Sequence, residues 1–379
     1  MVKELTRKMK DSGVEWIGEI PEDWELVRIS SVVKERSDKV SSIDYEPLSV
    51  TKQGVVPQLE GVAKSNNPND RKKVIKGDFV INSRSDRKQS CGIAPVDGSV
   101  SLINIILKLK RILPEYTKYL LDNYGFAEEF YRWGTGIVDD LWSTNYEKMK
   151  RIIIPLPPQS QQKSRADFLD KKVSEIDNII SKTKKAIEEY KRYKQSLITE
   201  TVTKGLDENV QMKDSGIEWI GEIPENWDIV KFKRLFRILN GKEIKNELNR
   251  NSENAIKVYG SGGVFKYTDD FLHNKTSILF GRKGTIGKPV IAEGKFWTVD
   301  TMYYTDIIHG NLKYIYYMLK AFPWEIITTQ TALPSITSTD LLNKYMSVAP
   351  FKEQEQIASY LNKKTNQIDQ IISTKEKLL

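Results

Sequence analysis

Apolar side chains recur at alternating steps of four and three residues along the middle of the chain. Such a heptad pattern is typical of a helix that packs against another helix in a coiled coil. It predicts a helix over residues 159–203, about 65 Å long at a rise of 1.5 Å per residue. The seam consists of Leu169, Val173, Ile176, Ile180, Thr183, Ile187, Tyr190, Lys194 and Leu197, of which Lys194 is the one strongly polar interruption.

A second heptad pattern lies at the end of the sequence, in the same phase as the first. Residues 158–187 and 350–379 align without a gap. If the two helices pack antiparallel, their seams cover each other and the two halves of the chain are related by a pseudo-two-fold axis. The second seam consists of Leu361, Thr365, Ile368, Ile372, Lys375 and Leu379.

Short β-like runs punctuated by Gly, Asn and Asp lie between the helical patterns. In the first half, strands are expected at 79–82, 92–94 and 103–109, and a helix at 116–132. In the second half, strands are expected at 277–280, 287–291 and 298–306, and a helix at 312–321. Strands and helices do not alternate regularly, so the sequence favours an α+β fold with a mixed or antiparallel sheet in each half.

A signature segment occurs twice, at 9–24 and 212–227, and its copies differ only at Val14/Ile217 and Asp23/Asn226. In each copy, Gly followed by Glu-Ile-Pro indicates a turn rather than a helix. The chain therefore consists of two copies of one unit, with shared ends and divergent middles. The two tryptophans of each copy are interpreted as buried anchors rather than ligand contacts; they are Trp16, Trp24, Trp219 and Trp227.

The composition favours a charged protein with an anionic partner. Lys and Arg number 59 against 51 Asp and Glu, which gives a net charge of +8. A basic excess of this size is compatible with nucleic-acid binding but is weak evidence alone. Cys91 is the only cysteine, which excludes a disulfide framework and a cysteine zinc site. No window approaches the roughly 18 apolar residues of a membrane span, and we expect a cytoplasmic protein.

The sequence offers no catalytic set. The Pro157-Pro158 pair lacks the flanking residues of an adenine-methyltransferase motif, and no Gly-Lys pair stands in a Walker frame. Only His273 and His309 are available for metal or triad chemistry. The acidic and basic pair at 243 and 245 is interpreted as a charged surface turn. We therefore expect no catalytic residue, no metal and no cofactor.

A signature, a variable body, a Pro-rich step at 154–158 and a heptad helix follow one another in the first half and recur in the second. This order resembles the specificity subunits of type I restriction-modification systems, over nearly the whole chain. The resemblance implies two pseudo-symmetric target recognition domains that each read one half of a bipartite site in double-stranded DNA. It also implies two long antiparallel coiled-coil helices that set the gap between the halves. These helices would bind two methyltransferase subunits and, through them, restriction subunits.

The resemblance divides the chain into a first recognition domain (1–157), a central helix (158–204), a second recognition domain (205–350) and a distal helix (351–379). Two features depart from the family pattern. The second Pro-rich step is reduced to the segment 348–351, and the sequence ends at the position equivalent to Ile187 of the first helix. The distal helix is therefore either naturally short or cut, which puts full partner binding by this chain in question.

Loops rich in cations, amides and glycine are candidates for DNA contact in the second half. Bidentate side chains read base edges, while Lys, Arg, hydroxyl groups and backbone amides bind phosphates. Residues 280–288 combine a strand end with glycines and cations, and they resemble a segment of the family's recognition domains. A Gly-rich loop at 259–263 is equally well explained as a tight turn, and a polar loop lies at 328–331. The predicted contacts are Ser261, Lys266, Tyr267, Arg282, Lys283, Thr285, Lys288, Gln330 and Thr331.

The first half offers a corresponding set. A loop at 82–89 follows an expected strand and carries three cations and two amides. The loop at 132–136 occupies the place of the Gln330 loop. The basic run at 70–73 is interpreted as a solvated edge. The predicted contacts are Arg84, Arg87, Lys88, Gln89 and Thr135.

Two other functions compete with DNA recognition. A stand-alone nuclease or methyltransferase would need a catalytic set that the sequence does not offer. A coiled-coil adaptor that does not bind DNA would leave the two divergent bodies without a role, and it is retained as the alternative.

Overall fold

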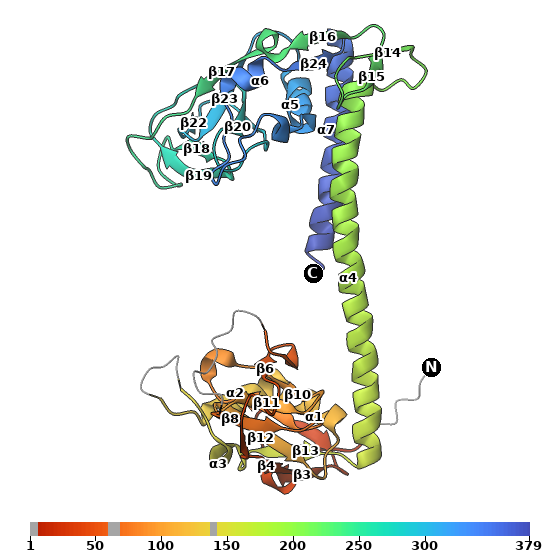
Figure 1. The fold of residues 1–379 in the computed structure, drawn as a ribbon, viewed down its shortest axis with the longest axis vertical. Helices are drawn as coiled ribbons and strands as arrows, with labels where there is room; N and C mark the ends of the chain where they lie inside the picture. Colours follow the sequence, from red (N-terminus) through yellow and green to blue (C-terminus); the bar gives the residue numbers. More distant parts are fainter. Residues whose placement is uncertain (1–6, 60–68, 137–141) are drawn as a thin grey trace. The chain divides into compact units, whose positions relative to one another are not determined.

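A computed structural model describes residues 7–59, 69–136 and 142–379 of the chain (Figure 1). The chain divides into two compact units, Met1–Asp177 and Asn178–Leu379. The boundary falls within one long helix, α4 (Gln159–Lys204). Each unit contains a sheet-rich body and one stretch of this helix.

Two antiparallel sheets form the body of unit 1. The larger has the strand order β10-β9-β12-β4 and the smaller the order β11-β8-β5. A hairpin of β6 and β7 packs beside β10 and β11. The strands are β4 (Val33–Glu35), β5 (Lys39–Val40), β6 (Leu48–Thr51), β7 (Gly54–Pro57), β8 (Arg71–Val74), β9 (Phe79–Asn82), β10 (Cys91–Ile93), β11 (Gly98–Ser101) and β12 (Asn104–Leu109).

The helix expected at 116–132 is interrupted in the structure. Two helices, α1 (Pro114–Leu121) and α2 (Tyr124–Arg132), replace it, and a short α3 (Tyr146–Met149) follows. The break occurs because Asn123 has an extended backbone and its Oδ1 accepts a hydrogen bond from the Phe126 N–H at 2.8 Å. Asparagine in this position caps a new helix rather than continuing the old one.

The body of unit 2 also has two sheets. The larger is antiparallel, with the order β17-β23-β20-β21, and the smaller has the order β19-β18-β22. Strands β18 and β22 pair in parallel, so the smaller sheet is mixed. The α+β prediction with antiparallel or mixed sheets is therefore confirmed. The elements are β17 (Phe236–Asn240), β18 (Ile256–Gly260), β19 (Gly263–Thr268), β20 (Ser277–Gly281), β21 (Val290–Ala292), β22 (Trp297–Thr298), β23 (Met302–Ile307), α5 (Leu312–Ala321) and α6 (Ser338–Leu342).

Each body begins and ends in a two-stranded antiparallel ribbon. In unit 1, β3 (Glu25–Arg28) pairs with β13 (Ile153–Leu156). In unit 2, β16 (Asp228–Lys231) pairs with β24 (Tyr345–Val348). The two ends of each body therefore lie side by side.

The signature forms a small hairpin in each unit. Strand β1 (Met9–Asp11) pairs with β2 (Glu19–Pro21), and β14 (Met212–Asp214) pairs with β15 (Glu222–Pro224). The first tryptophan of each copy packs on the body, with Trp16 edge-on to Phe126 at 5.9 Å and Trp219 edge-on to Phe322 at 6.0 Å.

The second tryptophan of each signature is bonded to the helix that closes the same unit. Trp24 Nε1 donates to Gln161 Oε1 on α4 at 2.9 Å. Trp227 Nε1 donates to Glu353 Oε2 on α7 (Phe351–Glu376) at 3.0 Å. The interpretation of the tryptophans as anchors agrees with these contacts.

Helix α7 packs antiparallel to the second half of α4. Lys375 Nζ lies over the Tyr190 ring, and Lys194, the polar interruption of the seam, forms an ion pair with Asp369. Residue numbers thus fall along α7 as they rise along α4. The apolar contacts of this seam are made by Ile187, Tyr190, Leu197, Ile368 and Ile372, and Leu361 joins the adjoining core.

Near the start of α4, the Tyr119 hydroxyl of α1 donates to Asp170 at 2.6 Å. No helix covers the seam between Val173 and Ile180 within the described residues. The apolar side chains there are open to solvent, with Val173 41% and Ile176 54% exposed. Leu169 and Ile180 on the same face are half-buried. The expected four-heptad pairing is therefore realised only beyond residue 183. None of the helices in the described ranges combines the length and the apolar character needed to cross a membrane.

Candidate nucleic-acid interface

The loop after β20 in unit 2 is held against the loop that precedes α6. Lys283 forms an isolated β-bridge with Ser335, and the Gly284 N–H donates to the Pro334 carbonyl at 2.9 Å. These contacts bring two segments predicted to bind DNA, the cationic loop at 282–288 and the polar loop at 328–331, to one place.

Arg282 is oriented by its neighbours in this loop. Its Nη1 donates to Asn240 Oδ1 at 3.1 Å, and its guanidinium lies 5.4 Å from the centre of the Tyr303 ring. Lys283 and Lys288 are exposed, and neither forms a salt bridge with any described residue. The loop therefore offers one oriented Arg and two cations whose charge is not neutralised.

Close packing of the backbone makes glycine necessary at two positions of the loop. A Cβ at Gly281 would lie 1.9 Å from the Thr285 carbonyl oxygen, and a Cβ at Gly287 would lie 2.6 Å from the Trp324 ring. The loop folds back on itself because neither position carries a side chain.

Hydroxyl groups stabilise the polar loop from within. The Thr329 hydroxyl accepts a hydrogen bond from the Ser335 N–H at 2.9 Å, and the Thr331 hydroxyl donates to the Leu333 carbonyl at 2.8 Å. Gln330 is exposed, and its amide forms no hydrogen bond with the described residues. Of the predicted contacts in this loop, Gln330 is therefore the one that is free to bind a ligand.

The corresponding loops of unit 1 are joined in the same way. Arg84 forms an isolated β-bridge with Ser143, as Lys283 does with Ser335. The Thr135 N–H donates to the Ser143 carbonyl at 3.0 Å. Arg84 therefore occupies the backbone position of Lys283, and Thr135 occupies that of Thr329, whose N–H donates to the Ser335 carbonyl at 3.0 Å.

The cations of the unit 1 loop are largely paired within the protein. Asp86 contacts both Arg84, at 3.0 Å, and Arg87, at 3.7 Å. Lys88 Nζ lies 2.9 Å from Glu128 Oε1, and Gln89 has a left-handed backbone with φ of 62°. The two bodies therefore present different charge at equivalent places.

Three predicted contacts of unit 2 form a separate group on the β18–β19 hairpin. Ser261 lies in its turn, Lys266 Nζ forms an ion pair with Glu247 at 2.6 Å, and Tyr267 bridges to Leu248. No hydrogen bond or ion pair joins them to the 282–288 loop among the described residues.

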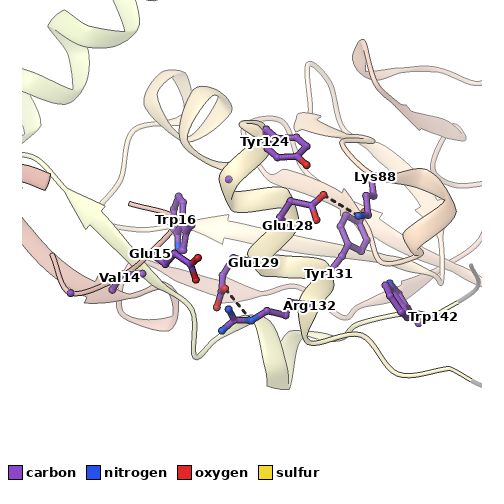
Figure 2. Close-up of a pocket in the computed structure, with 12 residues that line it drawn as sticks. Val14, Glu15, Trp16, Lys88, Tyr124, Glu128, Glu129, Tyr131, Arg132 and Trp142 are labelled. Carbon is purple, nitrogen blue, oxygen red and sulfur yellow. Dashed lines mark hydrogen bonds and ion pairs between the residues drawn. The ribbon is translucent and has the colours of Figure 1, made fainter. Parts of the chain in front are cut away.

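A cavity of about 650 Å³ in unit 1 lies between the signature hairpin and α2 (Figure 2). Trp16 and Trp142 line the cavity. Lys88 and Glu128, which form an ion pair with each other, line it as well. The indole N–H groups of both tryptophans are buried without a partner among the described residues. Sequence patterns do not indicate this cavity, because its walls come from four separate segments.

A second cavity of unit 1, of about 310 Å³, has both polar and apolar walls, and the sequence patterns do not indicate it. It is lined by Arg71, Asn82 and Asn104, which are 8%, 7% and 4% exposed, and by Arg84 and Arg87 of the predicted DNA-binding loop. The interpretation of the basic run at 70–73 as a solvated edge is therefore wrong for Arg71. That strand lies within the smaller sheet, between β11 and β5, and Arg71 is buried there.

Cys91 lies in surroundings that do not activate a thiol. Burial raises the pKa of the Cys91 thiol above its ordinary value, which disfavours the nucleophilic thiolate. Among the described residues, no three His, Cys, Asp or Glu side chains gather as a metal ion would require.

Known proteins similar to this chain share one description. The family model for the type I restriction modification DNA specificity domain matches residues 224–379. The MjaX specificity subunit of a type I restriction enzyme of Methanocaldococcus jannaschii is 26% identical over 95% of this chain and 90% of its own length. The MjaVIII specificity subunit of the same organism is 30% identical over 67% of this chain and 59% of its own length.

Two solved structures share the fold. One is a chain from work on complex assembly and conformational transition of the type I restriction-modification system, with a TM-score of 0.72 at 16% identity, covering 95% of this chain and 94% of that one. The other is the HsdS subunit of Thermoanaerobacter tengcongensis, with a TM-score of 0.57 at 15% identity, covering 95% and 92%. The family model and both relatives together indicate a specificity subunit of a type I restriction-modification system.

Proposed function

We propose that the chain reads a bipartite site in double-stranded DNA and that each unit reads one half. The reading bodies are the recognition domains at 1–157 and 205–350. The observation that carries the proposal is the paired loops, which occupy equivalent backbone positions in the two bodies but differ in their side chains. Equal scaffolds with unequal surfaces are what the recognition of two different half-sites requires.

The helices at 158–204 and 351–379 have two proposed roles. They set the gap between the half-sites, and they dock two methyltransferase subunits, which in turn bring restriction subunits. The exposed apolar face of α4 supports the docking role. It includes Phe168 and Ile179, 60% and 63% exposed, beside Val173 and Ile176. The chain acts as the non-catalytic specificity component of that complex.

Replacement of Arg282 and Lys283 by Ala tests the assignment of the readers. We expect DNA binding to weaken by about 1–3 kcal/mol because interactions with bases or phosphates are removed. The loss should appear with the duplex whose unit 1 half-site is scrambled, and not with the duplex whose unit 2 half-site is scrambled. The slope of log K against log salt should become shallower by about 0.9 for each phosphate that the variant no longer neutralises. The measurement is fluorescence anisotropy with duplexes in which one half-site at a time is scrambled.

The matched control is replacement of Lys233 and Arg234 by Ala, which removes the same charge from exposed positions of unit 2 outside the loop. Equal losses at both half-sites in the Arg282 and Lys283 variant would contradict the division of labour. A wild-type chain without sequence-dependent DNA binding, alone or with methyltransferase subunits, would instead favour the adaptor function.

A further inference from the structure

We infer that the cavity of about 310 Å³ in unit 1 receives a single nucleobase turned out of the DNA duplex, held by Arg71 and Asn104. The inference rests on the proposed DNA-reading function and adds a specific ligand to the first reading body. The cavity lies between the β6–β7 hairpin, β8 and the ends of β9 and β12. Its volume of about 310 Å³ is at the lower end of sites for small organic ligands.

The side-chain oxygen of Asn104 is the first observation. Asn104 is 4% exposed, and its Oδ1 has no hydrogen-bond partner among the described residues. Its Nδ2 donates to the Ser101 carbonyl at 3.0 Å, which fixes the orientation of the amide. A buried acceptor without a partner is unfavourable unless a ligand or water supplies the donor.

The guanidinium of Arg71 is the second observation. Arg71 is 8% exposed, and no described carboxylate pairs with it. Its Nε and Nη2 donate to the hydroxyl and carbonyl oxygens of Ser99 at 2.7 and 2.8 Å. Burial lowers the pKa of Arg71, although an arginine still carries its charge at neutral pH. Its other N–H groups, including both on Nη1, have no hydrogen-bond partner within 7–59, 69–136 and 142–379.

The combination of donors and an acceptor favours a base over a phosphate. A phosphate offers only acceptors and would leave Asn104 Oδ1 without a donor. Guanine presents the adjacent acceptors N7 and O6 beside the N1–H donor, and cytosine presents O2 and N3 beside its amino group. Either can accept two bonds from Arg71 and donate one to Asn104. Thymine and adenine do not place two adjacent acceptors beside a donor.

The burial of these groups favours an extrahelical base over one read in a groove. A base pair stays within the stack and presents only its edge, which reaches exposed side chains. Here Arg71, Asn82 and Asn104 line a cavity and are 8%, 7% and 4% exposed. Its walls include the apolar side chains of Leu48 and Val50. Leu59 and Ile103 also line it and are 51% and 42% exposed. Such side chains suit the faces of a flipped ring.

The other reading body does not repeat this arrangement. Asn82 and Asn104 are register partners on β9 and β12 of unit 1. The corresponding partners on β20 and β23 of unit 2 are Gly281 and Met302. The cavity therefore belongs to the part of the chain that differs between the bodies, as a determinant of sequence specificity should.

Mismatched duplexes test the inference directly. Once the wild-type site is known, a mismatch is placed at each position of the half-site read by unit 1, and the affinity of the full chain is measured. Turning a base out costs least when it is already unpaired. We expect a mismatch opposite one G or C to tighten binding about 10-fold, and mismatches elsewhere to weaken it. 2-Aminopurine placed beside that base should brighten on binding, because it loses its stacking partner.

Two variants tie the effect to the cavity. Asn104→Leu removes the buried acceptor, together with the donor to the carbonyl of Ser101, which is an exposed residue. Arg71→Met removes the guanidinium. Both should abolish the tightening by the mismatch and weaken binding to the matched site at least 10-fold. Asn104→Leu should leave the unfolding temperature unchanged or raised, whereas a structural role would lower it. Arg151→Met, an exposed position of unit 1, is the control for charge.

The outcomes separate this inference from the proposed function. Sequence-dependent binding in which no mismatch tightens, or in which Asn104→Leu binds like wild type, overturns the base site and leaves DNA reading intact. A cavity filled only by ordered water would give that result. Absence of sequence-dependent binding by the wild-type chain overturns both.

Discussion

The two signature segments differ at one charged position, and the helices differ reciprocally at the position beneath it. In unit 1, Asp23 accepts a hydrogen bond from Gln161 at 2.9 Å. In unit 2, the equivalent residues are Asn226 and Glu353. Each pair carries one carboxylate and one amide, so neither unit places two carboxylates together. We therefore expect the residues at positions 23 and 161 to be coupled.

Exchange of the pair in unit 1 tests this coupling. Gln161→Glu places a second carboxylate beside Asp23, with Arg7 as the shared cation, and it should lower the unfolding midpoint. Adding Asp23→Asn recreates the unit 2 pair and should recover most of the loss. Urea unfolding followed by tryptophan fluorescence measures both. If the double variant is no better than the single one, the two positions are not coupled.

The pH dependence of the Asp23→Asn variant follows from the same contacts. Hydrogen bonds from Arg7 and then Gln161 lower the pKa of Asp23 below its ordinary value. A lowered pKa stabilises the folded state above the unfolded pKa, near 3.9, and the gain is lost as the pH falls through the folded pKa. Wild type should exceed Asp23→Asn in stability at neutral pH. The difference should vanish in acid, as measured by unfolding midpoints from pH 7 to 2.

Glycine at position 281 should be indispensable to the cationic loop. Gly281→Ala puts a Cβ against the Thr285 carbonyl, so the loop must shift and DNA affinity should fall by about 1–3 kcal/mol. Gly262→Ala in the β18–β19 turn is the control, because its Cβ would meet nothing within 4 Å. Anisotropy measurements in which both variants lose the same affinity would contradict a special role for position 281.

At the level of elements, the spacing of apolar residues predicts the positions of long helices but not the contacts between distant loops. The heptad pattern located α4 to within a residue, because a long run of apolar spacing defines a helix without further information. The break at Asn123 was missed because a cap inside a periodic run looks like one helix. The pairing of Arg84 with Ser143 could not be predicted, since it depends on how distant loops meet rather than on local sequence.

The length of α4 provides a test of spacing at this level. The stretch at 173–180 has no helix opposite it among the described residues, so seven residues can be inserted there without disturbing the seam with α7. They lengthen the helix by about 10.5 Å, which corresponds to about three base pairs of DNA. The preferred spacer should grow accordingly, as measured with a series of duplexes. Affinity for each isolated half-site is the internal control, and an unchanged spacer preference would show that the helices do not set the gap.

At the scale of the whole molecule, we propose the open face of α4 as the docking surface for methyltransferase subunits. Val173→Glu with Ile176→Glu should leave folding of the isolated chain unchanged, because both side chains are exposed, and should weaken assembly with methyltransferase subunits by 10-fold or more. Ser174→Glu with Ser181→Glu adds the same charge to the same helix away from the seam. Analytical ultracentrifugation of the mixed subunits compares the two, and equal assembly by both variants would exclude this face as the docking surface.

The paired ribbons have a consequence for how such proteins change over generations. Because β3 pairs with β13, and β16 with β24, each body is topologically an insertion between two strands that already touch. A stretch of gene that encodes one body can thus be exchanged for another of different length, while the ends still meet in the same register. The 11-residue difference between the bodies, which follows from repeat offsets of 203 and 192, is the trace that such replacement would leave. A new sequence preference can then arise by exchange of a whole body, without any change in the ribbon strands and helices that carry it.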